Sequence, residues 1–175
     1  MTERIFHGRV RCMEYGDLEQ VLDWRNHPEV RKYMYTQCEI GMLEHQAWFD
    51  RESNNQKRHL LIYEVDGQPR GFVNISESIK GHVADWGFYL APQTARGSGR
   101  SLGIAALDFA FTNLKLHKLC GQVLDYNLGS IKFHLRMGFQ QEGALREQHF
   151  DGQTYHTVIH FGLLRHEWQA LNENY

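Results

Sequence analysis

The sequence is poor in cysteine and proline and has no long hydrophobic run. Its 175 residues include 3 cysteines and 3 prolines. Cys12, Cys38 and Cys120 stand far apart and form no CxxC pair, which indicates reduced structural thiols rather than a disulfide framework or a zinc site. No apolar run approaches the roughly 20 residues of a membrane-spanning helix, and the N-terminus lacks the apolar core of a signal peptide. We therefore expect a cytoplasmic protein with no membrane partner.

The chain also lacks an excess of charge of either sign. Its 19 Lys and Arg residues against 21 Asp and Glu residues give a formal net charge of -2, whereas sequence-independent nucleic-acid binding requires a strongly basic face. The 11 histidines do not occur in HExxH or comparable ligand spacing. We therefore expect neither a nucleic-acid partner nor a bound metal. A hydrophobic content of 42% is typical of a globular domain, and the length fits one domain, residues 1–175.

The hydrophobic pattern predicts a mixed α/β domain. After a first strand, the N-terminal third has helical spacing: Asp17 can cap one helix, and Pro28 suits the first turn of another. Asp66-Gly67 between two alternating runs predicts a hairpin, and Gly138 predicts a helix stop. The expected strands are residues 4–15, 59–65, 70–76, 82–90, 118–124, 140–150 and 154–164. Further expected helices are residues 40–51, 100–113 and 127–137.

A cluster of small and basic residues lies where the strand ending near Leu90 passes into the helix at 100–113. The cluster consists of Arg96, Gly97, Ser98, Gly99, Arg100 and Ser101. Backbone N–H groups in the first turn of a helix lack helical partners and attract anions. Glycines let a phosphate approach the backbone closely, and arginines add charge-assisted hydrogen bonds. The pattern is neither a Walker A loop nor GxGxxG, so the residues alone leave open a flexible turn with two solvated arginines.

The cluster resembles motif A of the GCN5-related N-acetyltransferases, (Q/R)xxGx(G/A), which follows the fourth strand and binds the pyrophosphate of acetyl-coenzyme A. Arg96 and Gly99 match, and Ser101 replaces the usual Gly or Ala. The resemblance extends over about residues 58–164, the cofactor-binding and catalytic core, with residues 1–57 as the substrate-specificity segment. It implies an α/β fold with a mixed, mostly antiparallel sheet of about seven strands, splayed between strands 4 and 5. Acetyl-CoA is the implied acetyl donor.

A second motif strengthens this resemblance. The run "NLGSIKFHLRMGF" resembles motif B of the same family, in which an Asn is followed by Ala or Ser, then Tyr, then Gly-Phe. Asn127, Ser130, Gly138 and Phe139 match, and His134 stands at the tyrosine position. Asn127 is expected to cap the helix and, with Ser130, to contact the cofactor. Two motifs in the right order on the right elements favour a cofactor cradle over a flexible turn.

The resemblance implies the remaining parts of an acetyl-transfer site. The pantetheine arm is expected to pair with the backbone of residues 88–90, namely Phe88, Tyr89 and Leu90. One N–H group there can stabilise the oxyanion. His134 is the expected general acid, because an imidazolium titrates near neutral pH. The alternatives are Tyr126 as the acid, or His134 as a packing residue. The base stays open among Glu77, His82, Asp85, Gln122 and a water relay.

The segment "DWRNHPEVRKYMY", followed by "HQAWF", resembles the N-acetyltransferases of pseudaminic acid biosynthesis, which acetylate the 4-amino group of a UDP-linked 4-amino-4,6-dideoxy-N-acetyl-altrosamine. This implies a nucleotide-sugar acceptor, with Arg25 on the diphosphate. The other expected acceptor-site residues are Met34, Tyr35, His45, Trp48, Ser76, Trp86 and Gln122. Helical spacing also fits Trp48 as plain core. The alternative functions are a ribosomal-protein-type N-terminal acetyltransferase and a non-catalytic coenzyme A-binding module, and the sequence leaves a homodimer open.

Overall fold

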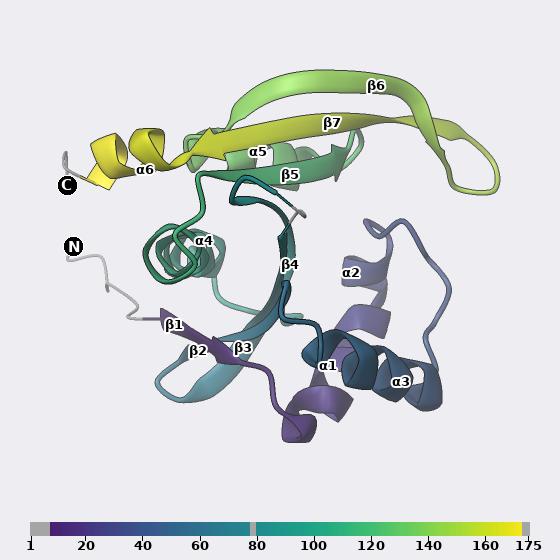
Figure 1. Ribbon diagram of the computed structural model, residues 1–175. Helices are drawn as coiled ribbons and strands as arrows, with labels where there is room; N and C mark the ends of the chain where they lie inside the picture. The colour runs from purple at the N-terminus through teal and green to yellow at the C-terminus, as the bar shows by residue number, and fades with distance from the viewer. Residues whose placement is uncertain (1–7, 78–79, 173–175) are drawn as a thin grey trace.

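A single twisted sheet of seven strands organises the protein (Figure 1). The computed structural model describes residues 8–77 and 80–172. The strand order is β1-β2-β3-β4-β5-β7-β6. The strands are β1 (Gly8–Cys12), β2 (Arg58–Val65), β3 (Gln68–Glu77), β4 (Val83–Leu90), β5 (Lys118–Leu124), β6 (Gln140–Phe150) and β7 (Tyr155–Leu164).

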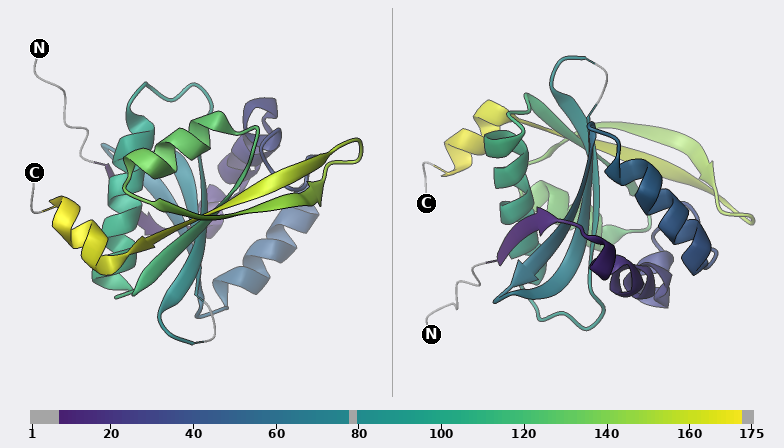
Figure 2. Two further views of the ribbon diagram at one scale, coloured as in Figure 1. Left: turned by 90° about the horizontal axis from the view of Figure 1, so that it is seen from above. Right: turned by 60° about the horizontal axis from the view of Figure 1, so that its bottom comes forward.

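Helices cover both faces of this sheet (Figures 1 and 2). The N-terminal helices lie on one face of the β1–β4 half, and α4 lies on the opposite face. The helices are η1 (Tyr15–Asp17), α1 (Leu18–Asn26), α2 (Pro28–Arg31), α3 (Met42–Ser53), α4 (Ser98–Asp108), the π-helix η2 (Phe109–Asn113), α5 (Leu128–Arg136) and α6 (Arg165–Asn172). No helix in the described part of the chain is long and apolar enough to cross a membrane.

The sheet divides between β4 and β5, which pair in parallel. These strands pair only from Val83↔Lys118 to Trp86↔Gly121. Beyond Trp86, β4 continues to Leu90 beside β3, while β5 continues to Leu124 beside β7. The seven-stranded, mostly antiparallel sheet and its split between strands 4 and 5 confirm the predicted α/β fold.

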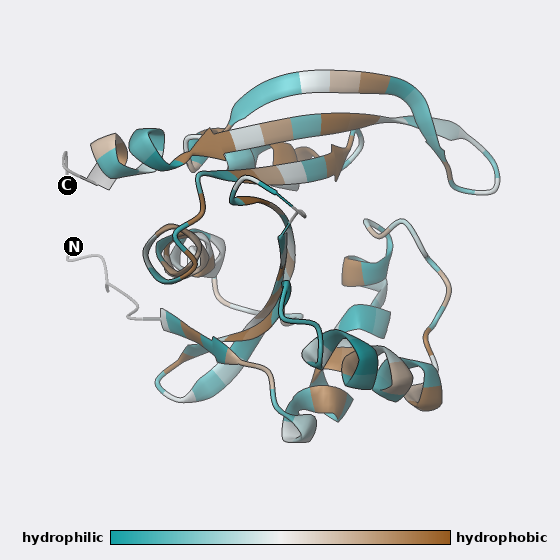
Figure 3. Cartoon of the chain, viewed as in Figure 1, coloured by the Kyte–Doolittle hydropathy of each residue, from teal (hydrophilic) through white to brown (hydrophobic). Residues whose placement is uncertain are grey.

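Strand alternation supplies two hydrophobic cores, one on each face of the sheet. On β2, Leu61 and Tyr63 point to the core beneath α4, which also includes Leu102. Their neighbour Ile62 points to the second core with Val21 of α1. Figure 3 shows where apolar residues occur along the strands of the sheet and along the helices. Fully burying one such side chain contributes about 1.5–3 kcal/mol. Packing in the two cores therefore fixes the helices on both faces of the sheet, and the place where β4 and β5 separate lies between these helix layers.

The local sequence signals have mixed outcomes. Asp66 and Gly67 both have positive φ, 51° and 73°, as the predicted hairpin requires. Gly138, with φ 89°, follows α5 as predicted, and Pro28 occupies the first turn of α2. Asp17 is the N-cap residue of α1 as predicted, but its carboxylate makes no cap bond to the helix. It accepts hydrogen bonds from the Arg11 guanidinium at 2.7 and 2.8 Å and from the Glu14 backbone N–H at 2.8 Å. The first residues of the expected strand 4–15 lie outside the described part.

Candidate active site

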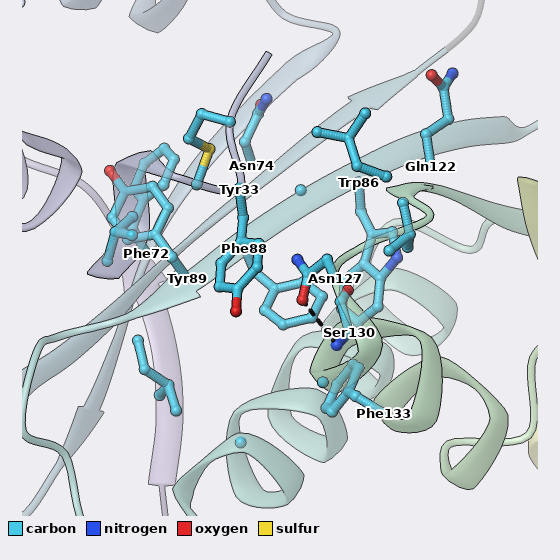
Figure 4. A pocket seen from close by; sticks show the side chains of 18 of the residues that line it. Tyr33, Phe72, Asn74, Trp86, Phe88, Tyr89, Gln122, Asn127, Ser130 and Phe133 are labelled. Atoms are coloured by element: carbon cyan, nitrogen blue, oxygen red, sulfur yellow. Dashed lines mark hydrogen bonds between the residues drawn. The ribbon is translucent and has the colours of Figure 1, made fainter. Parts of the chain in front are cut away.

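The split between β4 and β5 opens into a cavity of about 720 Å³, called the central cavity below (Figure 4). Side chains from α2, β3, β4, β5 and α5 line it. It reaches both faces of the sheet: Phe88 points with Trp86 toward α5, where it packs on Phe133, whereas Tyr89 packs on Phe72 of the opposite core. One end of the cavity therefore faces α4 and α5, and the other faces the N-terminal helices.

The expected phosphate cradle forms the N-terminus of α4. Gly97 precedes the helix with φ 92°, a conformation that favours glycine, and Gly99 lines the central cavity. The α4 first turn contains no acidic residue and its N-cap makes no side-chain hydrogen bond, which suits an anion. Arg96 and Arg100 are exposed beside this turn.

The two serines of this segment face the protein instead. Ser98 is buried, and Ser101 is half-buried near the Tyr63 phenol, whose Oη is buried without a hydrogen-bond partner among the described residues. Their part in a phosphate site is therefore limited to backbone N–H groups.

The edge of β4 provides the place for an extended cofactor arm. Phe88, Tyr89 and Leu90 all line the central cavity. One backbone edge of these residues pairs with β3, and β5 pairs with β4 no further than Trp86. The other backbone edge therefore borders the opening, where an extended chain can add as a short strand.

His134 lines the central cavity, but its protonation state differs from the one that the sequence led us to expect. It is 2% exposed. Its Nδ1 lies 2.8 Å from the Ser130 carbonyl oxygen, and its Nε2 accepts a hydrogen bond from Trp86 Nε1 at 3.3 Å. Burial lowers the pKa of His134 to about 4. The ring is therefore a neutral imidazole near pH 7, with both nitrogens engaged inside the protein, and this geometry does not provide the imidazolium acid predicted from the motif.

Tyr126, the alternative acid, is also held by protein groups. Its Oη donates to the Lys32 carbonyl oxygen at 3.2 Å and accepts from Gln37 Nε2 at 3.3 Å. Burial raises the pKa of its phenol. Tyr126 is not among the residues that line the central cavity, and it ties α5 to the segment after α2.

Asn127 is the N-cap residue of α5, and Ser130 lies in the first turn of that helix. The Asn127 side chain accepts a hydrogen bond from the Ser130 backbone N–H at 3.1 Å, drawn as the dashed line in Figure 4. This confirms the predicted helix cap. Both residues also line the central cavity, so they are placed to contact a bound cofactor.

Four of the expected acceptor-site residues line the central cavity, namely Met34, Tyr35, Trp86 and Gln122. Tyr35 Oη donates to Gln122 Oε1 at 3.2 Å, which carries the segment after α2 across to β5. Trp86 is a buried wall, 7% exposed, stacked on Phe139.

The structure settles which base candidates reach the cavity. Asp85 and Gln122 line it. Glu77 instead contacts the His59 ring, with Oε1 and Nε2 2.7 Å apart, and His82 is exposed in a turn with φ 53°. Strand alternation places Asp85 on the same face of β4 as Tyr89.

The other expected acceptor residues do not line the cavity. Arg25 Nη2 donates to the Thr36 carbonyl oxygen at 2.7 Å, and its Nη1 is buried with no hydrogen-bond partner among the described residues. Its role here is to hold the segment after α2. His45 stacks on Trp48 with ring centroids 5.1 Å apart, and both lie in the layer behind the cavity. Ser76 pairs with Asp85 across the β3–β4 ladder without reaching the lining.

Sequence reasoning missed several lining residues. Tyr33, Phe72, Asn74 and Gly87 border the central cavity, and the first three are labelled in Figure 4. Gly87 faces Asn74 across the β3–β4 ladder, and a Cβ at Gly87 would meet nothing within 4 Å. The available signal was the glycine within β4, since a strand glycine often marks a close approach by a ligand.

A mixed sheet split at its parallel pair, with a glycine-bordered helix N-terminus at one end of the opening, defines an enzyme that transfers an acyl group from a coenzyme A thioester. The model of the acetyltransferase (GNAT) domain family matches residues 9–140. The chain therefore belongs to the GNAT acetyltransferase family. It is an acetyl-CoA-dependent amine N-acetyltransferase, and no group of metal-ligating side chains occurs among residues 8–77 and 80–172.

The relatives of this chain include spermidine acetyltransferases and an acetyltransferase named PseH. The chain is 26% identical over 164 residues to spermidine N(1)-acetyltransferase of Escherichia coli (strain K12), covering 93% of this chain and 88% of that protein. It is 28% identical over 127 residues to acetyltransferase PseH of Campylobacter jejuni, covering 70% and 76%. The fold matches spermidine N-acetyltransferase from Vibrio cholerae in complex with CoA and spermine with a TM-score of 0.87, at 23% identity over 93% and 98% of the chains.

Proposed function

We propose that the acceptor is the 4-amino group of a UDP-linked 4-amino-4,6-dideoxy-N-acetyl-hexosamine of the altrosamine type, as in pseudaminic acid biosynthesis. The observation that carries this proposal is the aromatic lining of the acceptor end of the central cavity, in which most of the polar side chains are uncharged. Tyr33, Tyr35 and Phe72 supply rings, and Asn74 and Gln122 supply uncharged amides. Aromatic rings and a few polar groups suit a deoxy-sugar, which has one apolar face and scattered hydroxyl and amide groups.

Charge argues in the same direction. A polyamine carries several positive charges, and enclosing them requires nearby carboxylates. The lining contains two, Glu29 and Asp85. Glu29 already pairs with Lys32, with Oε2 and Nζ 2.8 Å apart. Asp85 is thus the lining carboxylate that has no ion pair within the described part of the chain, which matches an acceptor that presents one amine to the reaction.

The proposed chemistry uses the two faces of the opening. The acetyl thioester lies along β4, where a backbone N–H of residues 88–90 stabilises the oxyanion, a contribution of about 3–4 kcal/mol in acyl transfer. Asp85 receives the proton that leaves the amine through a water molecule, and Gln122 can hydrogen-bond to that water. The thiolate takes its proton from water, because both nitrogens of the His134 ring already have partners within the protein. Because the pKa of a thiol is near 8.5, the leaving thiolate takes up a proton readily at neutral pH.

A polyamine acceptor is the second candidate, favoured by the similarity to spermidine N(1)-acetyltransferase over 93% of the chain. The deciding experiment measures coenzyme A release by the wild-type protein with UDP-4-amino-sugars, spermidine and N-terminal peptides. A kcat/KM at least about 100-fold higher for the UDP-amino-sugar supports the proposal. Preference for spermidine or a peptide overturns it, and coenzyme A binding without turnover of any amine supports a binding module.

A further inference from the structure

A second, smaller hollow opens beside the acceptor end of the central cavity. It has a volume of about 300 Å³, and Tyr35 and Gln122 line both spaces. The bridge from Tyr35 Oη to Gln122 Oε1, 3.2 Å long, therefore stands between them. We call this space the side hollow. At about 300 Å³ it reaches the lower end of the usual size of small-molecule pockets.

We propose that the side hollow binds the phosphate-bearing end of the acceptor, while its amine reaches the acetyl group in the central cavity. This inference rests on the proposed nucleotide-sugar acceptor and names where its anionic part binds. The polar side chains that line the side hollow are those of Tyr35, Gln122, Gln148, His149 and His160. Each can donate a hydrogen bond, and none of the described lining residues carries a negative charge.

His149 supplies the most specific observation. Its Nε2 is buried and has no hydrogen-bond partner among the described residues. Its ring meets the Tyr35 ring edge-on, with centroids 5.0 Å apart, so it stands at the bridge between the two spaces. A buried polar atom without a hydrogen-bond partner is costly. A phosphate oxygen that enters the side hollow would give His149 Nε2 a partner and relieve that cost.

The shape of β6 explains how the hollow arises. The register between β6 and β7 shifts between Leu145 and His149, and Glu147 within this bulge has φ 53°. Bulges next to active sites redirect side chains. On β7, His160 pairs with Gln122 of β5, which places these two side chains on one face of the sheet.

Two carboxylates near His149 contact another histidine. His156, whose ring centroid lies 6.5 Å from that of His149, contacts Asp151 at 2.8 Å and Asp125 at 3.6 Å. The cofactor cradle at α4 cannot be the same anion site, because Gly99 lines the central cavity and not the side hollow.

The test measures binding of UDP by calorimetry to the full protein saturated with coenzyme A, so that the cofactor site is occupied. His149→Ala and His160→Ala should each weaken UDP binding about tenfold to 150-fold, the range for losing a hydrogen bond to a charged group. Acetyl-CoA affinity should stay unchanged in both. His166→Ala is the matched control, because His166 is exposed on α6, and it should bind UDP like the wild type.

The outcomes separate this inference from the proposed function. No UDP binding by the wild-type complex, or equal binding by all variants that retain acetyl-CoA affinity, overturns the inference. If spermidine is the preferred acceptor but UDP binds and both histidine variants weaken it, the proposed function fails and the side hollow remains an anion site. Inorganic phosphate is the second probe: binding as tight as that of UDP would show a free-phosphate site and overturn the acceptor assignment.

Discussion

Replacing His134 should change how the stability of the protein depends on pH. In the folded state burial lowers the pKa of this imidazole from 6.5 to about 4, whereas in the unfolded chain it titrates near 6.5. Between these values the unfolded state binds a proton that the folded state does not. The free energy of unfolding therefore falls as the pH is lowered from about 6.5 toward 4, and it is flat above about pH 7.5 as far as this group is concerned.

The magnitude follows from the two pKa values. One pKa unit corresponds to about 1.4 kcal/mol. For a group that shifts from 6.5 to about 4, lowering the pH from 8 to 5 removes about 2 kcal/mol of stability. Because the side chain is 2% exposed, solvent screening reduces this little. A loss of about 2 kcal/mol is a substantial part of the 5–15 kcal/mol that stabilises a typical domain.

Urea denaturation of the wild type and His134→Gln at pH 8 and pH 5 measures the effect. Glutamine is uncharged at both values, so the variant lacks the histidine contribution, while the carboxylates shared by both proteins cancel in the comparison. The wild type should lose about 2 kcal/mol more than the variant between pH 8 and pH 5. Equal losses would refute the argument, because they would mean that His134 titrates alike in the folded and unfolded chains.

The low pKa of His134 also predicts how kcat depends on pH. A group with a pKa of about 4 is protonated in about one molecule in a thousand at pH 7, too few to act as the main acid. The kcat of the wild type should therefore show no alkaline limb near neutral pH that disappears in His134→Gln. An alkaline fall in kcat near neutral pH that is present in the wild type and absent in His134→Gln would identify His134 as the general acid.

Three further changes test the two ends of the cavity and the helix that closes it. Gly99→Val should lower the affinity for acetyl-CoA because the added methyl groups enter the cradle. The protein should still fold, since a Cβ at this position meets only Leu90 Cδ1 at 3.8 Å. Calorimetry measures the affinity, and Gly143→Val is the control because a Cβ there meets nothing within 4 Å. Gly87→Ala should raise the KM of the acceptor about tenfold or more and leave that of acetyl-CoA unchanged, and parallel changes in both would contradict the placement. Asn127→Ala should cost about 1 kcal/mol through loss of the α5 cap, measured by urea denaturation, whereas Asn127→Ser should retain most of it.

The parts of the fold governed by local sequence were predictable. β5 begins and ends where the apolar run at residues 118–124 does, and the hairpin at Asp66-Gly67 follows from positive φ. The π-helix η2 and the helix α6 were missed. Neither is marked by a turn signal: α6 starts directly after β7, and the predicted helix at 100–113 simply changes its hydrogen-bonding period near Phe109.

The cofactor end of the site was more predictable than the acceptor end for a physical reason. A phosphate cradle uses backbone groups and glycines that are adjacent in sequence, so a short motif marks it. The acceptor end is assembled from distant segments: Tyr35 and Gln122 are hydrogen-bonded across 87 positions, and Asn74 lies on a third element. Arg25, His45 and Trp48 fit the composition of a binding site, but only tertiary packing determines that they stand behind the lining rather than in it.

The histidine in place of the motif's usual tyrosine belongs to a group of three residues that fit one another. A Cβ on Gly121 would lie 2.6 Å from His134 Nε2 and 3.0 Å from Trp86 Nε1, so the Trp86–His134 hydrogen bond requires a glycine there. This glycine is also the last β5 residue that pairs with β4. A larger ring at position 134 would have to displace Trp86 or open the sheet. His134, Trp86 and Gly121 therefore pack together at the point where β4 and β5 part.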